Sequence, residues 1–282
     1  GGRLRLNHNV DDSTNNFIGT YNFPSINAYQ LTQQGLVAGQ TTAQIRATCQ
    51  AAALLVNPSD TNPACGPNQF TISAGTPRAI ITVMDVGLYL QDDWRVRPNL
   101  TLSGGLRFET QTKVPDKVDI APRVGLAWAV GNKNRPTVIR GGFGIFYDRF
   151  SENNVLQLAR QNGVLQQSYI VTAPDCYPNC SVATSVAAVS APTVYSQASN
   201  FRSPYIMQGA ASVERQVTRV INMSMNFVTS RGVHSLITNN INAPLPGSGT
   251  RPFGNVGNIY QYQTAGSFRQ NQLINSVKWP TA

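Results

Sequence analysis

Charged residues are scarce in this chain. Only 12% of its 282 residues are Asp, Glu, Lys or Arg, about half of the roughly 25% that is usual for a soluble globular protein. A soluble protein of this size covers its surface with charged side chains. Part of the surface of this protein must therefore contact something other than water. Disorder does not explain the deficit, because disordered chains combine low hydrophobicity with high charge, and 41% of this chain is hydrophobic.

Long hydrophobic runs are also missing. A helix that spans a membrane needs about 20 consecutive apolar residues, and no segment of this chain approaches that length. The apolar residues must therefore be distributed by alternation with polar residues. This distribution predicts a β-rich chain.

Catalytic and metal-binding motifs are absent as well. The sequence contains no GxSxG, HExxH, P-loop or GxGxxG motif, and its histidines, His8 and His234, have no nucleophile or orienting acid in the same motif. Asp92 and Asp93 are adjacent, but neighbouring strand residues point to opposite faces and cannot share one site. We therefore expect no enzyme activity, no metal site and no cofactor.

The excess of basic residues does not indicate nucleic acid. The chain has 22 Lys and Arg against 13 Asp and Glu, a formal net charge of +9. A nucleic-acid-binding protein would gather the basic residues on one face or along one helix. Here they occur singly or in twos along the whole chain, so we expect no nucleic-acid partner.

All four cysteines lie in stretches rich in Pro, Asn and Ser. A zinc site would need nearby histidines or a second close pair of cysteines, which the sequence lacks. We therefore favour two local disulfides, Cys49 with Cys65 and Cys176 with Cys180, formed in an oxidising compartment. Four unpaired loop thiols are the alternative.

Alternation of apolar and polar residues dominates the remaining sequence. Between residues 82 and 94 the even-numbered positions are mostly apolar and the odd-numbered positions mostly polar. Each strand of this kind has one apolar and one polar face. The template predicts about ten strands, and they include 2–9, 17–23, 82–94, 100–109, 123–130, 139–148, 205–217, 221–227 and 269–279.

Short and long connections alternate along the chain. Short turns are expected at 95–99, 131–136 and 218–219, and longer excursions at 24–77, 111–119, 151–204 and 232–267. Tight turns at one rim and long loops at the other are typical of an outer-membrane barrel, whose tight turns face the periplasm. We therefore predict an all-β, antiparallel up-and-down transmembrane β-barrel, present in part, with extracellular loops at 24–77, 151–204 and 232–267. Helical patterns at 28–38, 42–56 and 152–160 predict exposed helices in these loops.

Aromatic residues gather where strands end. All three tryptophans end a strand before a short turn or the chain end, where an inner aromatic girdle is expected. Three further aromatics flank the excursion at 151–204, where the outer girdle belongs. The girdle candidates are Trp94, Trp128, Trp279, Tyr147, Phe150 and Tyr205.

The few charges of the strands share their polar faces with Ser, Thr and Gly. If lipid covers the apolar faces, these charges point into the lumen, which accounts for the low charge content. The lumen candidates are Arg107, Glu109, Arg123, Arg140 and Asp148. Pairing across adjacent strands is the alternative role for each of them.

Five segments carry a more specific pattern: YLQDDWRVRPNLTLSGGLRFE (89–109), APRVGLAWAV (121–130), TVIRGGFGIFYDRF (137–150), SPYIMQGAASVERQV (203–217) and GNIYQYQTAGSFRQNQL (257–273). They resemble consecutive barrel strands of TonB-dependent outer-membrane receptors, and most closely the Oar-like branch. The blocks QDDW…L..GLR.E and APR.G….RGG.G.FYDR carry the likeness to this branch. The loops 30–77 and 165–200 match nothing in it.

This resemblance implies import of a solute through a barrel of about 22 strands, powered from the inner membrane by TonB acting on a plug. It also implies a full-length protein that consists of a carboxypeptidase-regulatory-like domain, a plug and a barrel. The implied partners are outer-membrane lipid, the protein's own plug and missing barrel strands, TonB, and an unidentified extracellular solute. The lumen charges would contact plug or solute, and the loops 24–77 and 151–204 would capture ligand.

The chain shows no TonB box, plug or regulatory domain and has too few strands to close such a barrel. It opens without a signal segment and stops just after a strand-like run. We therefore expect residues 1–282 to be part of one receptor barrel domain in a longer gene product.

Two other functions stay open at this point. A non-transporting surface or adhesion protein displayed by a barrel would have the same strands, and upstream sequence with a plug and a TonB box would distinguish the two. The third is a soluble β-sandwich binding module, which would purify as a soluble monomer without detergent.

Overall fold

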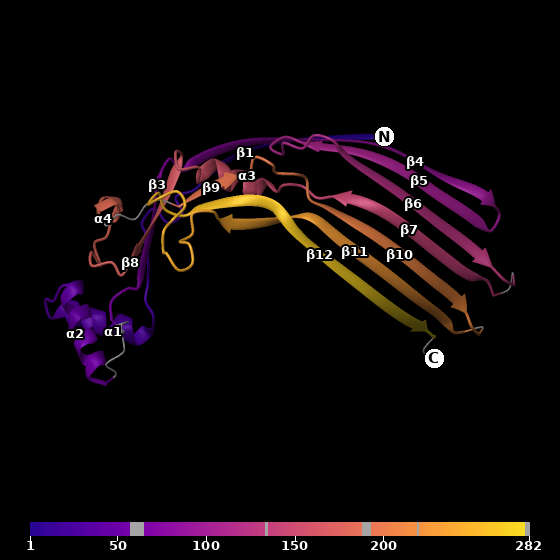
Figure 1. Ribbon diagram of the computed structural model, residues 1–282. Coiled ribbons are helices and arrows are strands. Elements are labelled where there is room, and N and C mark those ends of the chain that lie inside the picture. Colours follow the sequence, from indigo (N-terminus) through magenta and orange to yellow (C-terminus); the bar gives the residue numbers. More distant parts are fainter. Residues whose placement is uncertain (57–64, 133–134, 188–192, 219, 280–282) are drawn as a thin grey trace.

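The computed structural model describes residues 1–56, 65–132, 135–187, 193–218 and 220–279 (Figure 1). Parts of the expected loops 24–77 and 151–204, parts of the turns 131–136 and 218–219, and the last three residues lie outside these ranges. The described chain forms one large and one small β-sheet, with four helices in the connections.

Nine strands form the large sheet, in the order β1-β4-β5-β6-β7-β10-β11-β12-β9. Neighbours are antiparallel except β12 and β9, which are parallel. The strands are β1 (Gly2–Asp12), β4 (Arg78–Arg97), β5 (Leu100–Gln111), β6 (Asp119–Val130), β7 (Thr137–Tyr147), β9 (Val194–Gln197), β10 (Tyr205–Gln216), β11 (Asn222–Asn240) and β12 (Ile259–Lys278). The order confirms the prediction of an antiparallel up-and-down sheet as part of a barrel; the described strands do not close it.

A second unit, which we name the extension, lies at the far end of these strands. It comprises the sheet β2-β3-β8 and three helices. Figure 1 shows it opposite the ends that the short turns join. Its elements are β2 (Thr20–Asn22), α1 (Ile26–Val37), α2 (Thr42–Val56), β3 (Gln69–Gly75), β8 (Gln166–Thr172) and α4 (Val182–Ala187).

Helices α1, α2 and α3 occur where the sequence predicts them, whereas α4 was not predicted. The hydroxyl oxygens of Ser25 and Ser151 accept hydrogen bonds from backbone N–H groups in the first turns of α1 and of α3 (Glu152–Arg160). Glu152 in the first turn and Arg160 in the last turn of α3 also match the polarity of the helix dipole.

Some strand boundaries differ from the prediction. Residues 17–23 do not join the large sheet, because only β2 forms there and it pairs with β3. Half of the expected loop 232–267 is strand, since β11 and β12 stay paired as far as Asn240 and Tyr260. Register shifts after Gly232 and Ser235 let this hairpin bend and continue, and its polar composition hides the alternation.

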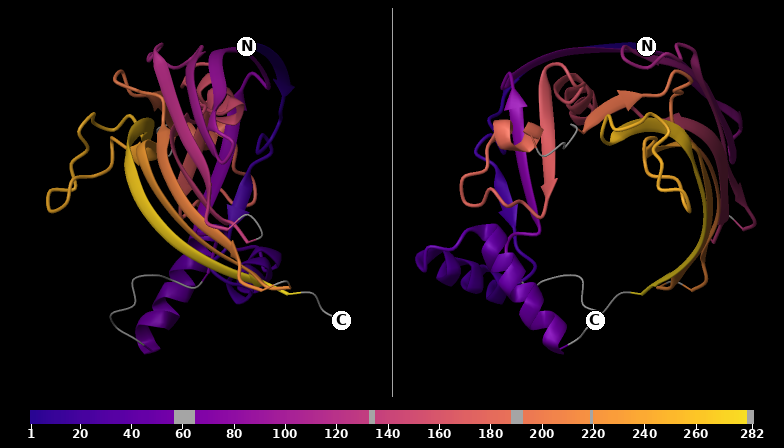
Figure 2. Two further views of the ribbon diagram at one scale, coloured as in Figure 1. Left: turned by 90° about the vertical axis from the view of Figure 1, so that its right-hand side faces the viewer. Right: turned by 60° about the vertical axis from the view of Figure 1, so that its left-hand side comes forward.

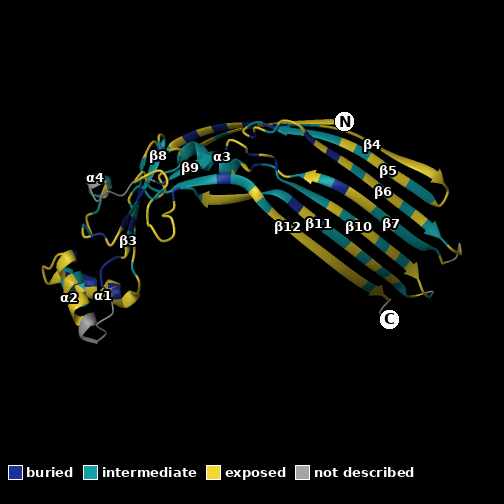
Figure 3. Cartoon of the chain, viewed as in Figure 1, coloured by how far each residue is buried: buried dark blue, intermediate teal, exposed yellow. Residues whose placement is uncertain are grey.

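The strand register gives the large sheet two chemically different faces. Residues opposite each other in paired strands share a face, so Arg107, Arg123 and Arg140 lie on one side, which we name the inner face. The other side, the outward face, exposes large apolar side chains such as Leu90 (78%) and Val124 (60%). Figure 3 shows this alternation along the strands, and Figure 2 shows the sheet curving around the side on which α3 lies.

No second sheet covers the outward face within the described ranges. A soluble β-sandwich would bury that face against a partner sheet about 10 Å away, so the arrangement disagrees with the sandwich alternative. The main apolar cluster instead lies on the inner face, where Val155 of α3 packs with Ile81 and Val83 of β4. A second cluster fills the extension around Phe70 and Tyr169.

Candidate functional site: the inner face and the extension

Helix α3 crosses the inner face near the extension. At one side, Arg160 pairs with Asp11 of β1, and Asn7 donates a hydrogen bond to Glu152. At the other side, the hydroxyl of Tyr262 in β12 donates to Gln157 Oε1 at 2.5 Å. The helix therefore links β1 with β12, which are separated by six strands in the sheet order, and acts as a strap across the concave side.

Asp85 of β4 is the most buried charge in this region, with 3% of its side chain exposed. Its Oδ2 accepts a hydrogen bond from Arg5 Nε at 2.8 Å. The same oxygen forms ion pairs with Arg5 Nη2 at 2.7 Å and with Arg149 Nη1 at 3.2 Å. Its Oδ1 is buried without a hydrogen-bond partner among the described residues. Two cations therefore compensate one buried carboxylate, as the desolvation cost of a buried charge requires. Arg149 belongs to the segment that leads into α3, so this pairing fixes where the helix begins.

Arg140, one of the predicted lumen residues, pairs across strands. Its Nη1 lies 3.0 Å from Glu214 Oε2 in β10, and Asn222 donates to the other oxygen of Glu214 at 2.8 Å. With Lys278 these residues line a polar hollow of about 190 Å³ near the short turns. The alternative role, pairing between neighbouring strands, is therefore what the geometry shows for Arg140.

Arg107 and Arg123 are stacked on aromatic rings instead. The guanidinium carbon of Arg107 lies 5.3 Å from the centroid of the Tyr89 ring, and that of Arg123 lies 4.2 Å from the Phe146 centroid. Both contacts are within the range of cation–π attraction. Neither arginine has an ion pair among the described residues, so the inner face presents both charges without a direct carboxylate partner.

The two predicted lumen carboxylates lie nearer the extension. Glu109 is directly opposite Asp119 on the inner face, and Asp119 accepts a hydrogen bond from the Ser203 hydroxyl at 2.6 Å. Asp148 is exposed just beyond β7 and accepts from the Arg149 backbone N–H. The inner face thus carries paired, stacked and unpaired charges, which gives it a polar surface of mixed sign.

Four of the six predicted girdle aromatics, Trp94, Trp128, Tyr147 and Tyr205, lie on the outward face by the strand register, and Trp279 directly follows the end of β12. The rings of Tyr147 and Tyr205 are 5.3 Å apart at the extension end of β7 and β10, and the three tryptophans lie at the short-turn ends, 44% to 65% exposed. Phe150 is the exception and corrects the prediction. It is 2% exposed and packs against Phe201 and Tyr262 in the inner cluster, because the chain turns inward after Asp148 to begin α3.

Two disulfides join the predicted cysteines of the extension, Cys49 with Cys65 and Cys176 with Cys180. Tyr21 anchors the second of these loops: its hydroxyl donates to the Pro178 carbonyl at 3.0 Å and accepts from the Cys180 backbone N–H at 2.9 Å. Burial raises the pKa of Tyr21 above its ordinary value, and the Cys180 hydrogen bond opposes that rise.

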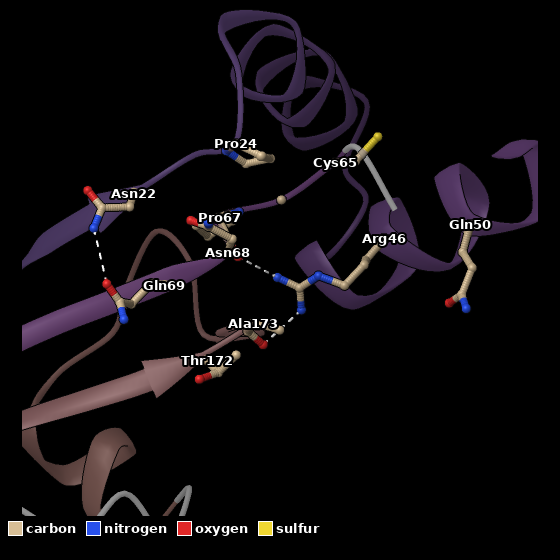
Figure 4. Close-up of a pocket in the computed structure, with 11 residues that line it drawn as sticks. Asn22, Pro24, Arg46, Gln50, Cys65, Pro67, Asn68, Gln69, Thr172 and Ala173 are labelled. Atoms are coloured by element: carbon tan, nitrogen blue, oxygen red, sulfur yellow. Dashed lines mark hydrogen bonds between the residues drawn. The ribbon is translucent and has the colours of Figure 1, made fainter. Parts of the chain in front are cut away.

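A pocket of about 610 Å³ opens between α2 and the strands β3 and β8 of the extension. Figure 4 shows the side chain of Arg46 crossing it to the backbone carbonyls of Pro67 and Ala173, at 3.0 and 2.9 Å. Amide and hydroxyl groups form much of the remaining lining, from Asn22, Gln50, Asn68, Gln69 and Thr172. Because Arg46 already satisfies these carbonyls and pairs with Asp175, the pocket offers neutral hydrogen-bonding groups more than charge.

The described ranges hold no group of three or more His, Cys, Asp or Glu side chains that could bind a metal ion. None of the helices within those ranges has the length and hydropathy needed to cross a membrane.

Sequence reasoning did not single out Asp85, Arg5, Arg149 or Glu214. The available signal was an acidic residue in a strand whose preceding inner-face positions, Ile81 and Val83, are apolar. That break in the pattern indicates that another element covers the strand and supplies a partner for the charge.

The fold is that of an outer-membrane barrel wall, with one apolar and one polar face. A family model described as outer membrane beta barrel domain matches residues 1–117 and 113–278. The chain belongs to this family.

Among solved structures, the chain is similar to the outer membrane transporter YddB from Escherichia coli, with a TM-score of 0.53 and 16% identity over 77% of this chain. That likeness concerns the fold alone, and the chain spans only 24% of the transporter's length. The siderophore receptor PirA from Pseudomonas aeruginosa has a lower TM-score of 0.46, with 13% identity over 73% of this chain and 34% of the receptor. A mutant of the ferric enterobactin receptor (PfeA) from the same organism also has a TM-score of 0.46, with 12% identity over 74% of this chain and 26% of the receptor. No curated protein matches the sequence.

Proposed function

We propose that this chain is part of the barrel of a TonB-dependent outer-membrane transporter of the Oar-like type, which binds and imports an extracellular solute. The observation that carries the proposal is the division of the nine-stranded sheet into an exposed apolar face and an inner face with charges that lack an ion-pair partner. A lipid-embedded wall around a polar lumen requires both. An adhesion protein needs only the outward face, so the inner-face charges favour transport.

In this proposal residues 1–282 belong to one barrel domain whose remaining strands and plug lie elsewhere in the protein. The short turns face the periplasm, and the extension and the hairpin tip at 241–258 face the outside of the cell. Arg107, Glu109 and Arg123 contact the plug or the solute on its way through the lumen. TonB supplies the energy through the plug.

The extension supplies the capture site. Its pocket presents amide and hydroxyl groups from α2, β3 and β8, which match the hydrogen-bonding pattern of peptides and carbohydrates. Two disulfides and the Arg46 contacts hold these elements in place. Preorganisation of this kind lowers the entropic cost of binding.

Solute depletion from a defined mixture of oligosaccharides and short peptides tests the proposal. Four strains are compared by mass spectrometry of the medium: wild type, a deletion of the full gene, the complemented deletion, and a strain without TonB. Certain solutes should disappear only when both the gene and TonB are present. Equal depletion in all four strains, with the protein detected at the surface, would contradict transport, and loss of surface attachment in the deletion strain would then favour adhesion.

A further inference from the structure

Two arginines on the outward face break its apolar pattern. Arg231 of β11 and Arg269 of β12 are directly opposite each other in the strand register, and both are exposed. Like charges in directly opposed positions repel each other. Neither guanidinium has an ion pair with any residue in the described ranges, so the repulsion has no compensation from the protein.

Their depth in the membrane follows from the tryptophans. Trp279 directly follows β12 and is ten residues beyond Arg269. At about 3.3 Å per residue with a strand tilt near 40°, this separation corresponds to roughly 25 Å along the membrane normal. The apolar band of a barrel has about that height. Arg231 and Arg269 therefore lie at the boundary opposite Trp279, beside the Tyr147 and Tyr205 pair.

A surface hollow of about 700 Å³ adjoins the two arginines. Gly209, which has no side chain, leaves space between Phe143 and Thr229 in the neighbouring strands. Phe143 and Met207 give the hollow apolar walls, whereas Arg231 and Arg269 stand at its charged end. One row deeper, Thr229 donates to Asn271 Oδ1 at 2.7 Å, so two more polar side chains adjoin the site.

We propose that Arg231 and Arg269 bind the phosphate of a lipid in the leaflet on the side of the long loops, with the lipid's acyl chain along Phe143 and Met207. A phosphate between the guanidiniums accepts hydrogen bonds from both and removes their repulsion. This inference rests on the proposed function only in requiring that the outward face lies in lipid.

Photocrosslinking tests the site in the full-length protein, reconstituted into vesicles with a diazirine-bearing lipid. The probe is either phosphatidic acid, with an exposed phosphate, or phosphatidylcholine, whose phosphate is shielded by choline. Peptide mapping should show roughly ten-fold more crosslinking of phosphatidic acid than of phosphatidylcholine near Met207 and Thr229, since each arginine near the surface attracts an anionic lipid. Arg231→Gln/Arg269→Gln should reduce the ratio to about one, whereas Arg231→Lys/Arg269→Lys, which keeps the charge, should retain most of it.

Arg215→Gln is the matched control, because Arg215 lies on the same outward face of β10, opposite Met223 at the short-turn end. This variant should leave the ratio near Met207 unchanged. Equal crosslinking of the two lipids in the wild type, or an unchanged ratio in the Gln double variant, would overturn the phosphate site. If neither lipid labels any outward residue, the face is not in lipid, and the proposed function fails together with this inference.

Discussion

At the scale of single residues, Asp85 helps to hold helix α3 against the inner face. Its carboxylate is nearly inaccessible and serves two arginines, one from β1 and one from the segment leading into α3. Removing the charge leaves Arg149 without its ion-pair partner, whereas Arg5 keeps a longer contact of 3.9 Å with Glu152 of α3. The effect is moderated because Arg5 is 42% exposed and can recover water.

Asp85→Asn should therefore loosen α3 by about 2 kcal/mol, toward the lower end of the roughly 1.5–3 kcal/mol typical of a hydrogen bond to a charged group. Hydrogen exchange of residues 152–160 in the full-length protein measures this as a loss of protection. Asp148→Asn is the control, because the Asp148 side chain is exposed and has only a local backbone contact. Equal protection in Asp85→Asn and wild type would show that α3 does not depend on this charge.

The ion pair between Arg140 and Glu214 should contribute less to stability than the contacts of Asp85. Their side chains are 53% and 37% exposed, and exposed pairs stabilise proteins by less than about 1 kcal/mol. A double-mutant cycle with Arg140→Gln and Glu214→Gln, followed by urea unfolding, measures the coupling. A coupling well above that limit would mean that the plug or other strands bury the pair.

At the scale of elements, the extension depends on covalent links as well as packing. Its sheet has only three strands, and its apolar cluster is centred on four buried side chains. The Cys49 and Cys65 disulfide ties α2 to the segment before β3 across 16 residues of sequence. The Cys176 and Cys180 disulfide closes a loop of only 4.

Cys49→Ser/Cys65→Ser should therefore expose α2 to proteolysis while the large sheet stays resistant. A loop of this length is worth about 3 kcal/mol in the chain-entropy model, and a shorter loop is worth less. Cys176→Ser/Cys180→Ser is the comparison and should have the smaller effect on cleavage rate in limited proteolysis. The reverse order would show that the 176–180 loop, through Tyr21, carries more of the extension's stability.

Elements differ in how far the sequence predicts them, and the reason is physical. β5, β6 and β4 beyond Val83 alternate between apolar and polar residues because one side meets lipid and the other the polar inner face, so a local pattern reports their environment. β9 pairs with β12 across more than sixty residues, and its Tyr and Ser residues carry no such alternation. The sequence predicts helix α3 but not where it packs on the inner face. The contacts of Val155 and Phe150 depend on where the chain turns after Tyr147.

The candidate site residues also divide into features that a local pattern predicts and features that depend on long-range contacts. The strand period alone places Arg107, Arg123 and Arg140 on the inner face. Their partners come from other strands through register, which period-two alternation does not determine. The break in the apolar pattern of β4 points to Asp85 alone; its two arginines are brought to it only by the tertiary fold, so no local signal identifies them as its partners.

At the scale of the whole molecule, the open sheet and its two faces follow from one requirement. Backbone groups in lipid must pair within the protein, and β1 ends the described sheet at one side. The proposed missing strands would pair with that edge and close the wall. β4 and β12, each 20 residues long, exceed the 9 to 11 or so residues needed to cross a bilayer, so both project beyond it toward the extension.

Nitroxide scanning of β11 in the full-length protein in membranes tests the central claim most directly. Spin labels at Met223, Met225 and Phe227 should be accessible to oxygen, which partitions into lipid, and shielded from a water-soluble nickel complex. Labels at Ser224, Asn226 and Val228 should show the opposite preference, with a period of two residues. Equal access of the nickel complex to both sets would contradict a lipid-facing outward side and, with it, the barrel-wall account.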